Sequence, residues 1–196
     1  MKLTLATLPG DLPAALRPLL EQAEVFDSSC SEEARVFFID KDGGYFLKRA
    51  PAGSLAREAT LTRWFHGKGL AARVLDYIPE EAYDWLLTEK IHGDDLCAAK
   101  YIEQPERLTD ALADCLRMLH GDFCLPNIII NDWRFSGFID LGSGGAGDRH
   151  WDIFWALWTL QHNLHTDQYG ERFLEAYGRS LVDDDRLRLC AAIVAM

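Results

Sequence analysis

Short runs of alternating apolar and polar residues dominate the first half of the chain. Two of these runs, 36–39 and 45–47, are rich in β-branched and aromatic residues and are joined by Lys-Asp-Gly-Gly at 41–44. Turn residues between two such runs are typical of a β-hairpin. The same kind of pattern predicts two further strands at 71–77 and 83–91.

A helical period appears between these pairs of strands. Apolar residues recur at a spacing of three to four from Leu55 to Phe65, which predicts an amphipathic helix. Ser54 is placed to cap the start of this helix, and Gly67 and Gly69 are placed to end it.

The second half of the chain is mainly helical in pattern. One apolar helix face begins after Glu103, short strands are predicted at 127–130 and 135–139, and two amphipathic helices follow at 148–164 and 168–181. Strands that precede helices in this way predict an α+β fold.

The helix predicted at 148–164, together with the residue that follows it, carries two groups of conspicuous side chains. Trp151, Trp155 and Trp158 recur at helical spacing, so we expect them in the core rather than at a ligand site. His162 and His165 have no third metal ligand near them in the sequence, and we expect them at the surface.

Composition limits the classes of partner. The 196 residues are 48% hydrophobic, which is enough for a sizeable core, and the net charge is −11. That charge repels nucleic acids and attracts small cations, although acidic surfaces also simply aid solubility. No apolar run is long enough for a membrane span, and Pro9, Asp11 and Pro13 interrupt any signal peptide. The five cysteines form no C-x-x-C pair, so we expect reduced thiols and a cytoplasmic location.

The segment LHGDFCLPNIIINDWRFSGFIDLGSGG, residues 119–145, carries the most chemical information. Asp122 follows His-Gly, Asn127 comes five positions later, and a predicted hairpin separates them from Asp140. Phosphoryl transfer from ATP uses one carboxylate to orient the attacking hydroxyl, and a second carboxylate with an amide oxygen to hold Mg²⁺. Each Asp beside a Gly could alone be a turn residue. The ordered set is more specific and favours a phosphotransferase.

A second His-Gly-Asp occurs at residues 92–94. Its fifth following residue is Ala99 rather than Asn, so this copy lacks the amide partner for a metal. We interpret it as a turn with solvated acidic side chains.

Upstream residues supply candidate contacts to a nucleotide. Lys48 follows an apolar strand and Glu58 lies in the next helix, which suits a Lys on the phosphates and a Glu that fixes it. The loop at 27–34 precedes the first hairpin strand and offers Ser28 and Ser29 as donors to phosphate, or is an ordinary polar loop.

On these motifs the chain resembles the aminoglycoside phosphotransferases, and its pattern is similar to that of their 3′-phosphotransferase (kanamycin kinase) branch. The residues that carry the resemblance are HGDFCLPN at 120–127, FIDLGSGGAGDRHWDI at 138–153, FLK at 46–48 and Glu58.

This resemblance implies a protein-kinase-like two-lobed fold, with an antiparallel β lobe that binds nucleotide at 1–89 and a shortened helical lobe at 90–196. It also implies transfer of the ATP γ-phosphate to a hydroxyl of an aminoglycoside, and hence antibiotic resistance. The implied roles are Asp122 as the catalytic Asp, Asn127 and Asp140 as Mg²⁺ ligands, Lys48 paired with Glu58 on the phosphates, and Phe46 stacked on adenine.

Two departures from the family pattern bear on the substrate. The family has a further helical insert before the HGD motif, with acidic groups for the aminoglycoside, whereas Leu119 here runs straight into His120. The C-terminus reads CAAIVAM, where the family tends to end in acidic and aromatic residues. An internal deletion joined at His120 is our hypothesis. Two alternatives remain open, namely a kinase of another small hydroxyl compound such as choline, homoserine or an amino sugar, and an inactive nucleotide-binding remnant.

Overall fold

The computed structural model describes residues 3–30, 34–117, 124–144 and 147–195. The chain divides into two compact units, residues 1–91 and 92–196. Asp122, the predicted catalytic carboxylate, lies outside the described residues.

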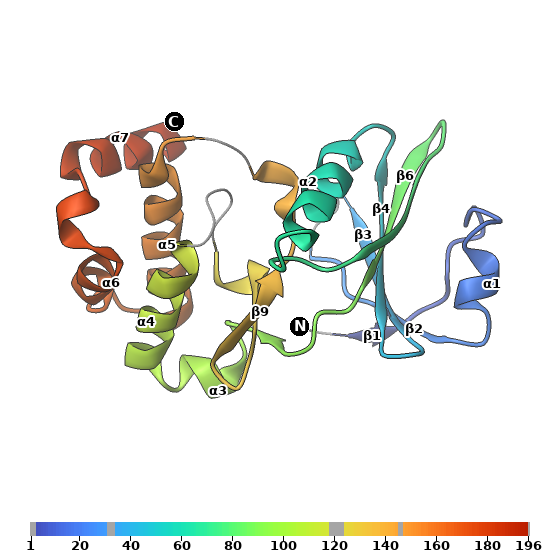
Figure 1. Cartoon of the computed structure of the whole chain (residues 1–196), viewed down its shortest axis with the longest axis horizontal. Coiled ribbons are helices and arrows are strands. Elements are labelled where there is room, and N and C mark those ends of the chain that lie inside the picture. The colour runs from blue at the N-terminus through green and yellow to red at the C-terminus, as the bar shows by residue number, and fades with distance from the viewer. Residues whose placement is uncertain (1–2, 31–33, 118–123, 145–146, 196) are drawn as a thin grey trace. The chain divides into compact units, whose positions relative to one another are not determined.

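The first unit is built on an antiparallel sheet of six strands in the order β1-β2-β3-β4-β6-β5 (Figure 1). The strands are β1 (Thr4–Leu5), β2 (Glu24–Asp27), β3 (Arg35–Asp40), β4 (Tyr45–Pro51), β5 (Val74–Pro79) and β6 (Tyr83–Glu89). Its helices are α1 (Arg17–Leu20) and α2 (Ala56–His66). The hairpin and the later strand pair predicted from the sequence are confirmed, and the hairpin strands are longer than expected.

Each face of this sheet has its own apolar cluster, as strand alternation requires. The larger cluster joins the segment around α1 to one face and consists of Leu12, Leu16, Leu20, Val25, Phe37, Ile39, Leu47, Trp85 and Leu87. On the other face, Leu55 and Ala59 of the α2 segment pack on Ala50 and Leu86.

The start of α2 differs from the prediction that Ser54 caps it. Leu55 occupies the cap position, and the Ser54 hydroxyl donates to the carbonyl of Pro51 instead. The Leu55 N–H donates to the Asp84 carboxylate on β6, at 2.9 Å. The cap is therefore supplied by a residue 29 positions away in the chain, which a local sequence pattern does not reveal.

The second unit combines a small antiparallel sheet, in the order β7-β8-β9, with helices. Its strands are β7 (Asp94–Asp95), β8 (Ile128–Asn131) and β9 (Arg134–Phe138). Its α-helices are α3 (Ala99–Ile102), α4 (Pro105–Leu116), α5 (Arg149–Leu164), α6 (Gly170–Tyr177) and α7 (Asp184–Val194). Short 3₁₀ turns are η1 (Leu125–Asn127), η2 (Leu141–Ser143) and η3 (Arg179–Leu181). The α+β class is confirmed.

The tryptophans of α5 do not form the core that the sequence predicted. Trp151 and Trp158 are exposed, at 37% and 44%, whereas Ile153, Ala156 and Leu160 of the same helix are buried. The indole rings instead contact one another in a row along the helix, and Trp158 stacks on the exposed His162 with ring centroids 4.7 Å apart. Helical spacing identified one face of α5 correctly, but it could not tell which face is buried.

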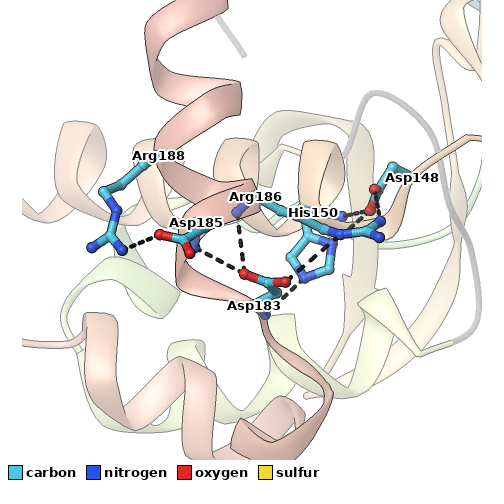
Figure 2. A network of polar contacts seen from close by, with 6 residues as sticks. All are labelled: Asp148, His150, Asp183, Asp185, Arg186 and Arg188. Carbon is cyan, nitrogen blue, oxygen red and sulfur yellow. Dashed lines mark hydrogen bonds and ion pairs between the residues drawn. The ribbon is translucent and has the colours of Figure 1, made fainter.

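A polar network joins the start of α5 to the start of α7 (Figure 2). Buried His150 contacts the Asp148 carboxylate through Nδ1 at 2.6 Å, and its Nε2 accepts the Asp183 N–H at 2.9 Å. Contacts at both ring nitrogens therefore fix the orientation of the buried imidazole. Hydrogen bonds from the backbone and side chain of His150, followed by the pairing with Arg186 of α7, hold the pKa of Asp148 well below its ordinary value.

All five cysteines lie in the described residues, and none of them forms a disulfide there. Burial raises the pKa of Cys97 to about 11 and that of Cys115 to about 12, whereas Cys30 is exposed. Among the helices within the described ranges, none has the length and apolar character needed to cross a membrane.

Candidate functional site

The first unit brings Lys48 and Glu58 together. Lys48 lies within β4 and Glu58 in the first turn of α2, and Lys48 Nζ is 2.7 Å from Glu58 Oε2. The exposed fractions of the two side chains are 20% and 10%, so both charges are largely removed from water. A partly buried ion pair of this kind can present a fixed ammonium group to phosphate oxygens.

Phe46 belongs to a row of aromatic rings on the same face of the sheet as Lys48. The two residues are two positions apart on β4, and side chains at that spacing project to one face. Phe46 lies opposite Phe38, with ring centroids 5.3 Å apart, and Phe38 lies opposite Phe26 at 6.2 Å. All three rings are only partly buried, so they offer an aromatic surface. The family resemblance pointed to Phe46 alone, and the sequence analysis did not single out Phe26 or Phe38.

Ser28 and Ser29 follow β2 and bond to the neighbouring strand segment. The Ser28 hydroxyl donates to the Val36 carbonyl at 3.2 Å, and the Ser29 hydroxyl accepts the Val36 N–H at 2.9 Å. The Ser29 N–H donates to the Asp27 carboxylate, and hydrogen bonds from Ser29, followed by Arg35, lower the pKa of Asp27. These contacts fix the backbone on one side of residues 31–33, which lie outside the described part.

The second unit places Asn127 and Asp140 at the same end of a hairpin. Ile128 of β8 pairs with Phe138 of β9, and beyond this pair the Ile139 N–H donates to the Asn127 carbonyl at 2.9 Å. Asn127 ends η1, and Asp140 follows Ile139 directly. The hairpin therefore brings the backbone at Asn127 and at Asp140 to the same end, whereas Asp122, the third residue of the predicted set, lies outside the described residues.

Asp140 has a left-handed backbone conformation, with φ 55° and ψ 52°. Few residues other than Gly adopt this region, and Asp and Asn are among those that tolerate it. Such a conformation is common where a side chain must be aimed at a functional site. Asp140 is exposed, which leaves its side chain accessible to solvent and ions.

The second His-Gly-Asp at 92–94 is part of the small sheet rather than only a turn. Asp94 begins β7, which pairs with β8, and its exposed carboxylate pairs with Lys100 at 2.8 Å. Gly93 approaches the Ile130 carbonyl so closely that an added Cβ would lie 2.3 Å from its oxygen. The interpretation of Asp94 as a solvated acid is confirmed, while the glycine is explained by strand packing.

Asp84 is a buried carboxylate that the sequence did not single out. It is 0% exposed, and its Oδ2 accepts both the Leu55 N–H and the Tyr77 hydroxyl, at 2.9 and 3.0 Å. Burial, together with the hydrogen bond and charge of Asp84, raises the pKa of Tyr77. The available signal was an acidic residue inside the apolar strand sequence YDWLLTE.

Two of the eight curated relatives that match this chain in sequence differ in how much of it they cover. One is a "Probable aminoglycoside 3′-phosphotransferase" of Lactococcus lactis, which is 38% identical over 240 positions that cover 90% of this chain and 92% of the relative. The other is an "Aminoglycoside 3′-phosphotransferase" of Niallia circulans, which is 39% identical over 58% of this chain and 36% of the relative. Because the first alignment has 240 positions and this chain has 196 residues, at least 44 positions of that alignment have no counterpart here.

Solved structures show the same fold at lower identity. A type VIII aminoglycoside-3′-phosphotransferase has a TM-score of 0.78 and 22% identity, and the match covers 90% of this chain and 94% of that one. APH(3″)-Id from Streptomyces rimosus, in complex with ADP and streptomycin, has a TM-score of 0.63 and 22% identity, with 80% and 87% covered.

The family comparison agrees with both sets of relatives. The model of the phosphotransferase enzyme family (APH) matches residues 25–120 and 116–190, two segments that meet and overlap at 116–120. Together these segments include the Lys48–Glu58 pair and the hairpin with Asn127 and Asp140. The chain therefore belongs to the phosphotransferase enzyme family.

Proposed function

We propose that this chain is an ATP-dependent phosphotransferase that transfers the γ-phosphate to a hydroxyl group of an aminoglycoside antibiotic and thereby confers resistance. The observation that carries the proposal is the β8–β9 hairpin, which makes Asn127 and Asp140 neighbours in a chain of this family. The similarity to relatives that are described as aminoglycoside 3′-phosphotransferases supports the choice of substrate class.

The first unit is proposed to bind the nucleotide. Lys48, held by Glu58, would contact phosphate oxygens through its ammonium group, and Phe46 would stack on adenine. In the segment between β2 and β3, the Ser29 hydroxyl is the proposed phosphate donor, because it accepts from Val36 and can still donate its own hydrogen. The Ser28 hydroxyl and the N–H groups of Ser28 and Ser29 already donate within the chain, so Ser28 would act only by holding this segment.

Asn127 and Asp140 fit Mg²⁺ because both offer oxygen ligands, which this hard cation prefers. No group of three or more His, Cys, Asp or Glu side chains suited to a metal occurs in the described part of the chain. The proposed ion would take one carboxylate and one amide from the protein and its remaining ligands from phosphates and water. When bound, Mg²⁺ would neutralise charge on the phosphates during transfer.

Asp122 is proposed to act on the acceptor. Its carboxylate would accept a hydrogen bond from the attacking hydroxyl and take its proton as the new bond from oxygen to phosphorus forms and ADP leaves. The net charge of −11 favours the approach of a cationic aminoglycoside.

A second candidate function is nucleotide binding without transfer. It is favoured by the minimum of 44 alignment positions without a counterpart and by the two family segments that meet at residues 116–120, directly before Asp122. Both observations agree with an internal deletion before the HGD motif. A chain without the helices that bind the acceptor could still hold ATP.

A coupled ADP-release assay with Mg²⁺, ATP and kanamycin separates the candidates. Kanamycin-dependent turnover that is lost in Asp122→Ala is the expected result. Turnover with choline, homoserine or an amino sugar in place of kanamycin would identify a kinase of another hydroxyl compound. Absence of all turnover, with a melting temperature that still rises on addition of Mg²⁺ and ATP, would favour the nucleotide-binding remnant.

A further inference from the structure

Asp84 links β6 to the start of α2, the helix that carries Glu58. The Leu55 N–H donates to Asp84 Oδ2 at 2.9 Å, and α2 has no capping bond from the side chain of its own cap residue. An anionic acceptor at a helix N-terminus satisfies an unpaired N–H and interacts favourably with the helix dipole. Asp84 therefore fixes where this helix begins on the sheet.

The position of Asp84 relates it directly to Lys48. Asp84 lies opposite Ala50 in the pairing of β6 with β4, and Leu86 lies opposite Lys48. Residues opposite each other or two apart project to the same face, so Asp84 and Lys48 share the face on which α2 packs. Glu58 follows Leu55 by three residues, about 4.5 Å along a helix at 1.5 Å per residue. Any shift in the start of α2 is thus transmitted to Glu58.

The burial of Asp84 indicates that its role is not simply to stabilise the fold. Its Oδ1 is buried and accepts no hydrogen bond from the described residues. A buried carboxylate with an unsatisfied oxygen is costly, and an apolar residue of similar volume often gives equal or greater stability at such a site. A carboxylate is useful here because it holds the helix start in one place.

From these contacts we propose that Asp84 is a positioning residue, which holds α2 so that Glu58 keeps Lys48 oriented toward the nucleotide phosphates. This inference rests on the proposed function, because it requires that Lys48 contact ATP. Asp84 itself touches no reacting atom in this account.

The test is a double-variant cycle for Mg²⁺-ATP affinity, measured by titration calorimetry. Asp84→Ala should raise the dissociation constant about tenfold, and Asp84→Asn, which keeps a weaker neutral acceptor, should raise it about threefold. In a Glu58→Gln background, each Asp84 substitution should change the free energy of Mg²⁺-ATP binding by less than half of the change that it causes in the unmodified chain. The reason is that Glu58, the group that Asp84 positions, has already been altered. Tyr77→Phe, which removes the other hydrogen bond to Oδ2, is the matched control and should leave the affinity unchanged.

The outcomes distinguish this inference from the proposed function. If the unmodified chain binds no Mg²⁺-ATP, the proposed function and the inference both fail. If it binds, and Asp84→Ala binds equally well or loses the same factor in both Glu58 backgrounds, the inference alone is overturned, because a merely structural role predicts additive effects. If Asp84→Ala does not fold, Asp84→Asn decides the question: full affinity in the Glu58 background overturns the inference, and a threefold loss confined to that background supports it.

Discussion

The left-handed conformation of Asp140 allows its chemical and structural roles to be separated by three substitutions. Most residues with a Cβ atom, such as Ala, lose about 1–2 kcal/mol of stability in this region. Asn and Asp are the exceptions, because their short polar side chains can form local hydrogen bonds. Gly avoids that cost but gains freedom in the unfolded chain, which lowers stability by about 0.4–1 kcal/mol. Asp140→Asn should therefore fold about as well as the unmodified chain, Asp140→Gly should be less stable by about 0.4–1 kcal/mol, and Asp140→Ala should be less stable by at least about 1 kcal/mol.

These free energies convert into measurable melting temperatures. For a chain of 196 residues, 1 kcal/mol corresponds to about 2–4 °C, so Asp140→Ala should melt that much below Asp140→Asn. Thermal melts followed by circular dichroism can resolve this difference. Equal melting temperatures for Asp140→Ala and Asp140→Asn would refute the reasoning from backbone conformation.

The same variants test the proposed metal ligand. All three lack the carboxylate, so all three should lose at least about tenfold in Mg²⁺-dependent affinity for ATP, about 1.4 kcal/mol, whatever their stability. Calorimetric titrations with and without Mg²⁺ give this quantity. Undiminished Mg²⁺-dependent binding by Asp140→Asn would show that Asp140 does not hold the ion.

Three further predictions concern other parts of the chain. Phe46→Leu should weaken ATP binding about two- to tenfold, which corresponds to about 0.5–1.5 kcal/mol for an aromatic contact. Phe26→Leu is the control, and an equal loss of affinity in this variant, measured by calorimetry, would contradict stacking at Phe46. The pKa of Asp148 is lowered in the folded chain, so its charge stabilises the fold above pH 3.8, and this contribution is lost as the pH falls further. Asp148→Asn should therefore lower the melting temperature at pH 7. The loss in free energy of unfolding should be less than about 1 kcal/mol, because the group is half-exposed, and the loss should be smaller near pH 3. Iodoacetamide at pH 8 should label exposed Cys30 well before buried Cys115, whose pKa is about 12, and mass spectrometry of peptides showing the reverse order would contradict the burial.

The elements that the sequence predicted well are those defined by local patterns. The Lys-Asp-Gly-Gly turn between two β-rich runs specifies the β3–β4 hairpin without help from distant residues. The spacing of Asn127 and Asp140 around a second hairpin likewise predicts that they are neighbours. In both cases the chain returns on itself within a few residues, so sequence distance and spatial distance are closely related.

The features that the sequence did not predict depend on contacts between distant segments. Ser54 has the right chemistry for a helix cap, but Asp84 on another strand takes that role. Trp151 and Trp158 have the spacing of a core face, but α5 is turned so that its smaller residues are buried. The sequence pattern did not predict β2, because its pairing with β3 is set by tertiary packing rather than by a turn signal.

Direct detection of phosphorylated antibiotic tests the central claim most directly. The unmodified chain and Asp122→Ala would each be incubated with kanamycin, Mg²⁺ and ATP labelled with ¹⁸O in the γ-phosphate, and the drug would be analysed by mass spectrometry. The account predicts kanamycin that carries one labelled phosphoryl group with the unmodified chain and none with Asp122→Ala. Unmodified kanamycin after prolonged incubation with a folded chain that binds Mg²⁺-ATP would contradict it.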